Sequence, residues 1–163
     1  MNKHLVTISW TRSGAVFTDN RYSRRHEWKF DGGLIIPASA SPFVVPIPLS
    51  DPAGIDPEEA FVASLSSCHM LWFLSIAAKV GFKIDQYQDK AEGIIEKDLE
   101  GQLAITIVTL RPVVIFSGDR IPEHNQVLDM HHLAHESCFI ARSVKTEIRC
   151  EPIPALRNGL KSK

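Results

Sequence analysis

The first third of the chain alternates apolar and polar positions in short segments, a pattern typical of β-strands. Segments of this kind occur at residues 4–10, 15–19 and 26–30, and a further apolar segment at 34–40 follows a turn signal at 31–33. We expect these segments to form a meander of strands.

A proline-rich connection separates this region from a long helix. Residues 42–57 contain five prolines, which favours an extended, irregular segment. Its end carries helix-start signals: Asp56 as the N-cap residue, Pro57 at the first helical position, and Glu59 at the spacing of a capping box. Gly81 is typical of a helix end, so the sequence predicts one helix between these signals.

Apolar residues recur at helical spacing through this helix and cover much of its circumference. The main stripe consists of Phe61, Leu65, Cys68, Trp72, Ile76 and Val80, with Val62, His69 and Phe73 beside it. The apolar run approaches the roughly 20 residues that cross a bilayer. It also contains four serines, a histidine and a lysine, so we expect a core helix with protein on most sides and no membrane span.

The second half of the chain predicts two long strands, a second helix and a final strand. Residues 82–98 and 103–116 are expected to pair as a hairpin around the turn at 98–102. A helix is expected over about 121–138, and the alternation at 143–151 predicts the last strand. The predicted order is β-β-β-α-β-β-α-β, an α+β fold with antiparallel sheets and two helices.

Composition and charge narrow the class of protein. The chain has 163 residues, of which 44% are hydrophobic and 23% charged, and its formal net charge is −1. These values are typical of one folded domain, so we expect a single domain over residues 1–163. The charge gives no basis for binding nucleic acid. No apolar segment of a secretory signal follows the first lysine, and we expect a cytoplasmic protein.

Three cysteines are candidates for chemistry. Cys68 lies in the first predicted helix, Cys138 at the end of the second, and Cys150 in the last strand. They are too few for a disulfide framework and have no CxxC spacing. Any cysteine chemistry must therefore join residues far apart in sequence. The alternative for each is burial as a small apolar side chain.

A group of histidines near Cys138 suggests a metal site. His131 and His135 have the i, i+4 spacing that can bind zinc, and His132 lies between them. The HExxH motif is absent, so a polar helix face is the favoured interpretation and a His/Cys metal-binding protein is the alternative. His69, beside the cysteine of the first helix, is expected to be a packed or hydrogen-bonded core histidine.

Four segments of the chain match a family signature in order. They are YSRRHEWKFDGG, GIDPEEAFVASLSSCHMLWFLSIA, FKIDQYQDKAEG and HESCFIARSV, and together they extend over nearly the whole chain. In the second segment Glu58 precedes Cys68 by ten residues, and the fourth carries Cys138. The chain thus resembles the OsmC/Ohr family, the osmotically induced and organic-hydroperoxide-resistance proteins.

This resemblance implies an intertwined α+β homodimer that acts as a thiol-dependent peroxidase. Cys68 would attack the O–O bond of an organic hydroperoxide as a thiolate and become a sulfenic acid, and Cys138 would condense with it to a disulfide. An external thiol or dithiol would then reduce the disulfide. The resemblance requires no metal and no organic cofactor, and it leaves Cys150 as a strand or core residue.

Activation of Cys68 requires a cation from outside its helix. The stabilisation that a helix N-terminus gives a thiolate fades within the first turn, and Cys68 lies eleven residues past Pro57. The resemblance favours Arg24 as the activating group, with Arg21 and Arg25 as the alternatives.

Glu58 raises a geometric question. Ten residues of helix place it about 15 Å along the axis from Cys68, too far for direct contact. In the intertwined homodimer that the resemblance implies, Glu58 could act through another chain and hold the arginine by a charge-assisted hydrogen bond. The alternative is an acidic residue favourably placed in the first turn of a helix.

Aromatic residues around the cysteines bear on the substrate. Trp72, Phe73 and Phe139 would suit an organic hydroperoxide better than hydrogen peroxide, and Phe139 follows Cys138 where many relatives have proline. The alternative from another class of function is a non-catalytic member that keeps the fold as a binding module for a small apolar ligand.

Overall fold

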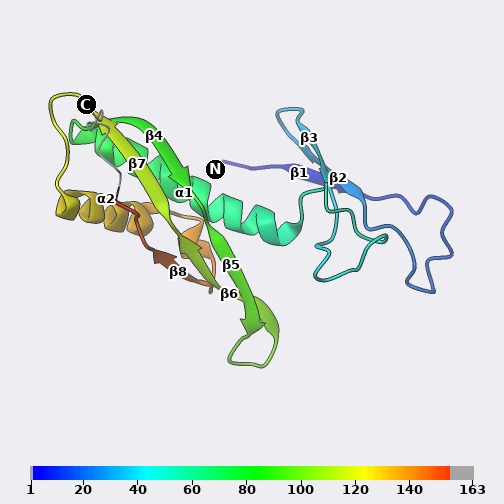
Figure 1. Cartoon of the computed structure of the whole chain (residues 1–163). Coiled ribbons are helices and arrows are strands. Elements are labelled where there is room, and N and C mark those ends of the chain that lie inside the picture. Colours follow the sequence, from blue (N-terminus) through cyan, green and yellow to red (C-terminus); the bar gives the residue numbers. More distant parts are fainter. Residues whose placement is uncertain (1, 155–163) are drawn as a thin grey trace, which may run out of the picture. The chain divides into compact units, whose positions relative to one another are not determined.

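The computed structural model describes residues 2–154 as eight strands, two α-helices and one 3-10 helix (Figure 1). In chain order the elements are β1 (Val6–Ser9), β2 (His26–Phe30), β3 (Ile35–Ala38), α1 (Pro57–Lys79), β4 (Lys83–Asp89), β5 (Glu92–Lys97), β6 (Leu103–Leu110), β7 (Pro112–Ser117), α2 (His124–Ser137), η1 (Ala141–Ser143) and β8 (Glu147–Cys150). The predicted α+β class with antiparallel sheets and two helices is confirmed. The chain forms two compact units, residues 1–60 and 61–163.

The N-terminal unit contains a three-stranded antiparallel sheet in the order β1-β2-β3, in which Val6 pairs with Phe30. The segment 15–19, which we predicted as a strand, is not one. Phe17 has a φ of +71°, and its ring stacks on Tyr22 with centroids 4.7 Å apart. A positive φ is incompatible with extended backbone, so this apolar segment packs locally instead of pairing.

The C-terminal unit contains two sheets built from one interrupted hairpin (Figure 1). The strands predicted at 82–98 and 103–116 are each divided, the first into β4 and β5 and the second into β6 and β7. β4 pairs with β7 and β5 pairs with β6, which confirms the predicted hairpin. Gly101 turns the hairpin with a φ of +79°, a conformation that favours glycine. β8 adds to β6 in the parallel direction.

Helix α1 begins and ends at the signals found in the sequence. The side chain of Asp56 accepts a hydrogen bond from the Glu59 N–H (2.7 Å), and the side chain of Glu59 accepts one from the Asp56 N–H (3.3 Å), which completes a capping box. At the other end Gly81 has a φ of +82°. The N–H of Phe82 then donates to the carbonyl of Ala77 (3.0 Å), as in a Schellman motif.

One face of α1 forms the centre of the C-terminal unit. Its C-terminal half packs around Phe73 and Ala77 with α2 and the β4/β7 sheet, and Leu65 packs with β6 and β8. The expectation that protein surrounds this helix on most sides is wrong for a single chain, because Leu71 is 60% exposed. The apolar circumference of α1 is wider than the face that the second helix and the sheets of one chain cover.

By length and composition α1 is the one helix in residues 2–154 that could cross a membrane. The core helix of a soluble protein meets the same test. The packing of α1 against α2 and against strands of both sheets is that of a core helix.

Candidate active site at the Cys68–Cys138 pair

Two cysteines that are far apart in sequence meet in the C-terminal unit. Cys68 lies in the middle of α1 and is 8% exposed, and Cys138 follows the last residue of α2 and is 1% exposed. The two side chains lie close together, since Cys68 is one cause of the raised pKa of the Cys138 thiol. The structure therefore brings the two predicted redox residues into contact.

The surroundings of Cys138 keep its thiol protonated. Burial raises its pKa and the hydrogen bond to Cys68 raises it further, to about 11, although a hydrogen bond from the Ala141 N–H to the Cys138 sulfur (3.4 Å) acts in the opposite direction. Only a thiolate is a strong nucleophile. Cys138 is thus a thiol that keeps its proton at neutral pH.

A pocket of about 550 Å³ opens beside Cys68 within the same unit. Its apolar wall includes Leu71, Trp72, Phe139 and Ile140, and three serines also line it. The volume lies within the range of small-molecule sites. Two of the three aromatic residues that we associated with a substrate line this pocket, whereas the third, Phe73, is fully buried in the core.

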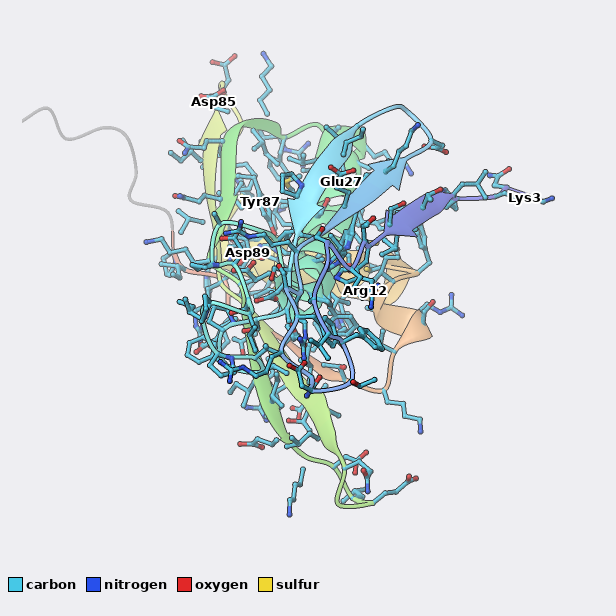
Figure 2. The ribbon with its side chains drawn as sticks, turned by 90° about the vertical axis from the view of Figure 1, so that its right-hand side faces the viewer. Lys3, Arg12, Glu27, Asp85, Tyr87 and Asp89 are labelled. Atoms are coloured by element: carbon cyan, nitrogen blue, oxygen red, sulfur yellow. The ribbon has the colours of Figure 1, made fainter. Side chains whose placement is uncertain are left out.

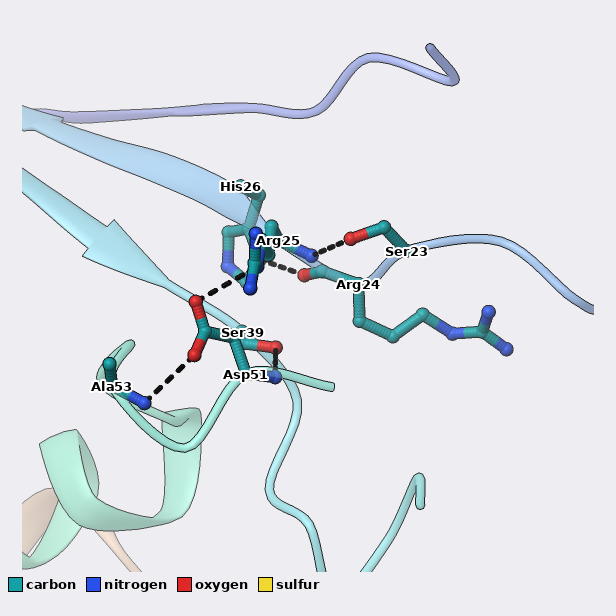
Figure 3. A network of polar contacts seen from close by, with 7 residues as sticks. All are labelled: Ser23, Arg24, Arg25, His26, Ser39, Asp51 and Ala53. Atoms are coloured by element: carbon teal, nitrogen blue, oxygen red, sulfur yellow. Dashed lines mark hydrogen bonds and ion pairs between the residues drawn. The ribbon is translucent and has the colours of Figure 1, made fainter. Parts of the chain in front are cut away.

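The arginines predicted to activate the thiol belong to the N-terminal unit and have different partners (Figure 3). Nε of Arg25 lies 2.9 Å from the carboxylate of Asp51 in an ion pair. Arg24 points away from Asp51 (Figure 3). Its guanidinium lies 3.7 Å from the ring centroid of Tyr22 and donates to the side-chain oxygen of Asn20 (2.7 Å). Arg24 is thus held by near neighbours in sequence, all of them neutral.

Glu58 also lies in the N-terminal unit, in the first turn of α1. Its carboxylate oxygen Oε2 is buried and has no hydrogen-bond partner within residues 2–154. No ion pair joins Glu58 to Arg24 or to Arg21 in this part of the chain. Arg21 donates its backbone N–H to the side chain of Asp19 (2.9 Å).

A second cluster in the C-terminal unit, here called the His–Cys cluster, consists of His69, His131 and Cys150. Nε2 of His69 lies 2.9 Å from Nδ1 of His131 and 3.7 Å from the sulfur of Cys150. The expectation that His69 is a packed, hydrogen-bonded core residue is confirmed, since it is 1% exposed. The sequence hypothesis grouped His131 with Cys138, but the structure places His131 beside His69 and Cys150 instead.

Burial determines the charge of the His–Cys cluster. It lowers the pKa of His69 to about 4, and the nearby His135 contributes a smaller part of this shift. It lowers the pKa of His131 to about 3, and here the smaller part comes from His69. Burial also raises the pKa of Cys150 to about 12, and the nearby carboxylate of Asp89 adds to this shift. At neutral pH the cluster therefore holds two neutral imidazoles and a protonated thiol.

Sequence reasoning missed this cluster because its members come from α1, α2 and β8. One signal was present: His69 lies on the apolar side of a helix, where an imidazole needs a polar partner. The identity of that partner depends on how the elements pack.

Comparison with known proteins shows which family has this fold. The family profile described as OsmC-like protein matches residues 50–152. An OsmC-like protein of unknown function from Vibrio cholerae is 56% identical, with a TM-score of 0.92 over 94% of this chain and 100% of that chain. The comparison with curated proteins gave no match.

Two organic hydroperoxide resistance proteins have the same fold at low identity. The protein from Elizabethkingia anophelis is 15% identical, with a TM-score of 0.69 over 97% of this chain and 98% of that chain. The protein from Bacillus subtilis is 16% identical, with a TM-score of 0.61 over 93% and 98%. These two likenesses show the fold alone. The profile match over more than half of the residues, together with the Vibrio relative, shows that the chain belongs to the OsmC family.

Proposed function

We propose that this OsmC-family protein is a thiol-dependent peroxidase that reduces organic hydroperoxides. The observation that carries the proposal is the closeness of Cys68 and Cys138, which is seen in the effect of Cys68 on the pKa of the Cys138 thiol. The apolar pocket beside Cys68 supports an organic substrate. The names of two relatives with the same fold, both organic hydroperoxide resistance proteins, support the same class of substrate.

In the proposed reaction the thiolate of Cys68 attacks one oxygen of the hydroperoxide. The O–O bond breaks, the alkoxide leaves and takes up a proton to become an alcohol, and Cys68 becomes a sulfenic acid. Cys138 then attacks the sulfenic sulfur, an S–S bond forms, and the hydroxyl leaves with the proton of Cys138 as water. Two electrons from an external thiol or dithiol reduce the disulfide through a mixed disulfide.

The thiolate of Cys68 needs a nearby positive charge, which we assign to Arg24. Arg25 is already engaged in the ion pair with Asp51, whereas every hydrogen bond of the Arg24 guanidinium goes to a neutral group. Glu58 has a buried carboxylate oxygen without a partner, so we assign it the role of fixing the guanidinium by a charge-assisted hydrogen bond.

A homodimer in the cytoplasm is part of the proposal. Leu71 and Phe139 line the pocket and are 60% and 62% exposed in one chain. Large apolar side chains that border a site in this way favour coverage by another copy of the chain. The oligomeric state in solution, measured by light scattering, tests this part independently of the chemistry.

The decisive experiment adds one equivalent of cumene hydroperoxide to the reduced protein. We expect two titratable thiols to disappear and mass spectrometry to find the peptides of Cys68 and Cys138 joined within one chain. A Cys150→Ser control should give the same result. A disulfide that contains Cys150 in the wild-type protein would contradict the assignment of the resolving cysteine.

The pocket also favours a second candidate function, a non-catalytic binding module for a small apolar ligand. This candidate predicts that Cys68 and Cys138 remain as thiols after the hydroperoxide is added. The same experiment therefore decides between the two functions.

A further inference from the structure

We propose that the His–Cys cluster is a binding site for a divalent metal ion of borderline softness, with zinc as the representative ion. The site lies in the C-terminal unit and uses none of the residues assigned to peroxide reduction. Each of His69, His131 and Cys150 offers one ligand atom, and these three atoms lie within 4.8 Å of one another. Imidazole nitrogen and thiolate sulfur are the ligands that zinc takes in proteins.

The spacing of the cluster fits a tetrahedral site. Zinc binds nitrogen at about 2.0–2.1 Å and sulfur at about 2.3 Å, which separates a nitrogen from a sulfur by about 3.6 Å and two nitrogens by about 3.4 Å. The distance between His69 Nε2 and the Cys150 sulfur is 3.7 Å. The distance between His69 Nε2 and His131 Nδ1 is 2.9 Å, the length of the hydrogen bond that the metal would replace. The two rings need to separate by about half an ångström to accept the ion.

The second ring nitrogen of His131 is a further polar atom of the cluster. His131 is 3% exposed, and its Nε2 is buried without a hydrogen-bond partner in the described part of the chain. Buried polar atoms of folded proteins are normally paired, so Nε2 calls for a partner of its own, such as a water molecule, while Nδ1 of the same ring faces the proposed ion. The two imidazoles and the thiol can make more polar contacts than the one hydrogen bond between the imidazoles.

The charges around Cys150 favour a cation. Asp89, which lies two residues from Tyr87 on β4 (Figure 2), and Glu151, which also pairs with Arg111 (3.4 Å), are close enough to put a negative potential at the Cys150 sulfur. The same negative potential attracts a positive ion. Burial, Asp89 and Cys150 also raise the pKa of the Tyr87 hydroxyl. On binding, the Cys150 thiol would lose its proton to solvent and the thiolate would ligate the ion, while both imidazoles are already neutral.

A pocket of about 250 Å³ gives access to the cluster from one side. It is lined by His131, Cys150, His132 and His135, among others. Three protein ligands leave one position of a tetrahedral ion open. A water molecule, or His135 at one helical turn from His131, is available on this side to fill it.

The test uses the full chain without a histidine tag, stripped of metal with a chelator and reduced. Zinc is added, the excess is removed by gel filtration, and metal is measured by elemental analysis. We expect about one zinc ion per chain. Cobalt(II) in its place should give the near-ultraviolet charge-transfer band of a thiolate ligand. A wild-type chain that retains no zinc and shows no such band would overturn the proposal.

Matched variants locate the ion. Cys150→Ser should abolish the cobalt–thiolate band and weaken zinc binding by more than the roughly 100-fold that loss of a supporting group costs. The double variant Cys68→Ser, Cys138→Ser should keep both the band and the zinc. The opposite pattern, a band that survives Cys150→Ser and disappears in the double variant, would place the metal at the redox pair and overturn the proposal.

A histidine pair provides a second test that does not depend on a thiol. His131→Gln should lose zinc, and His124→Gln, at the exposed start of α2, should keep it. Far-ultraviolet circular dichroism checks that each variant is folded. If the folded His131→Gln variant binds zinc as tightly as the wild type, His131 is not a ligand and the site is wrong.

Discussion

Cys68 and His69 are neighbours on α1, yet they belong to two regions with different chemistry. Cys68 borders an open pocket and lies near Cys138, whereas His69 lies in the His–Cys cluster beside Cys150. Successive residues of an α-helix differ by about 100° around its axis. This rotation is enough to place Cys68 beside Cys138 and its pocket, and His69 in the His–Cys cluster. The position of each residue around the helix decides which of the two regions it joins.

The largest expected effect comes from removing the accessible thiol. Cys68→Ser should lower kcat/KM for cumene hydroperoxide by at least about a thousandfold, since the loss of a nucleophile typically costs this much or more. Cys150→Ser should leave kcat/KM within about twofold, because the Cys150 thiol, whose pKa is raised, lines a different pocket and takes no part in the attack. Steady-state kinetics with a dithiol reductant measures both. Equal losses of kcat/KM in Cys68→Ser and Cys150→Ser would contradict the assignment of peroxide reduction to Cys68 alone.

The free energy of unfolding should also differ between substitutions on the core side and on the pocket side of α1. Phe73 is fully buried and stacks on His131 with ring centroids 4.1 Å apart. Phe73→Ala should therefore lower the free energy of unfolding by about 3–5 kcal/mol. Leu71→Ala, on the pocket side, should change it by no more than about 0.5 kcal/mol in the monomer. Urea denaturation gives both values, and a large loss in Leu71→Ala would show that a partner covers this side.

The sequence predicted those parts of the fold that depend on local signals. The capping box of Asp56 and Glu59 and the positive φ of Gly81 involve residues within a few positions of one another, and both ends of α1 were found. Phe17 shows why 15–19 was wrong. Apolar alternation does not reveal a residue with positive φ, and the ring of Phe17 packs on Tyr22 rather than within a sheet.

In the candidate site, too, some residues could be found from the sequence, whereas their contacts could not. Cys68 and Cys138 were identified through the family resemblance, and their contact depends on the packing of α1 against the end of α2. The partner of His69 was not predictable, because α1, α2 and β8 each contribute one member of the cluster. Spacing along one helix suggested His131 with His135, but contacts between elements decide the partner.

Two arginine variants test which residue makes the thiol of Cys68 reactive. Arg24→Ala should lower kcat/KM by about a hundredfold, the order expected when one charge-stabilising donor is removed. Arg25→Ala removes an ion pair with Asp51 in which the arginine side chain is 69% exposed. Its cost should be at most about 1 kcal/mol of stability, with little change in kcat/KM. If Arg25→Ala shows the larger kinetic loss, the activating residue has been assigned to the wrong neighbour.

The smallest expected effect concerns the proton of Cys138. The side chain of Cys68 is one cause of the raised pKa of Cys138, about 11, through a hydrogen bond that Cys68→Ala removes. The pKa of Cys138 should therefore fall, by up to roughly one unit for a single hydrogen bond. Burial, the larger cause, remains, so the thiol stays protonated at neutral pH. Its alkylation rate at mildly alkaline pH, followed by peptide mapping, should rise by up to about tenfold.

Cys150 provides the internal reference for this measurement, because burial, Asp89 and Glu151 raise its pKa and Cys68 does not. Its alkylation rate should be the same in the metal-free wild-type protein and in Cys68→Ala. Ser67→Ala, which also shortens a side chain that lines the pocket, controls for easier access of the reagent. A rise confined to Cys138 would show that the two sulfurs are coupled through one proton. If the rates of Cys138 and Cys150 rise together, the substitution has loosened the core that both regions share, and the separation between them fails.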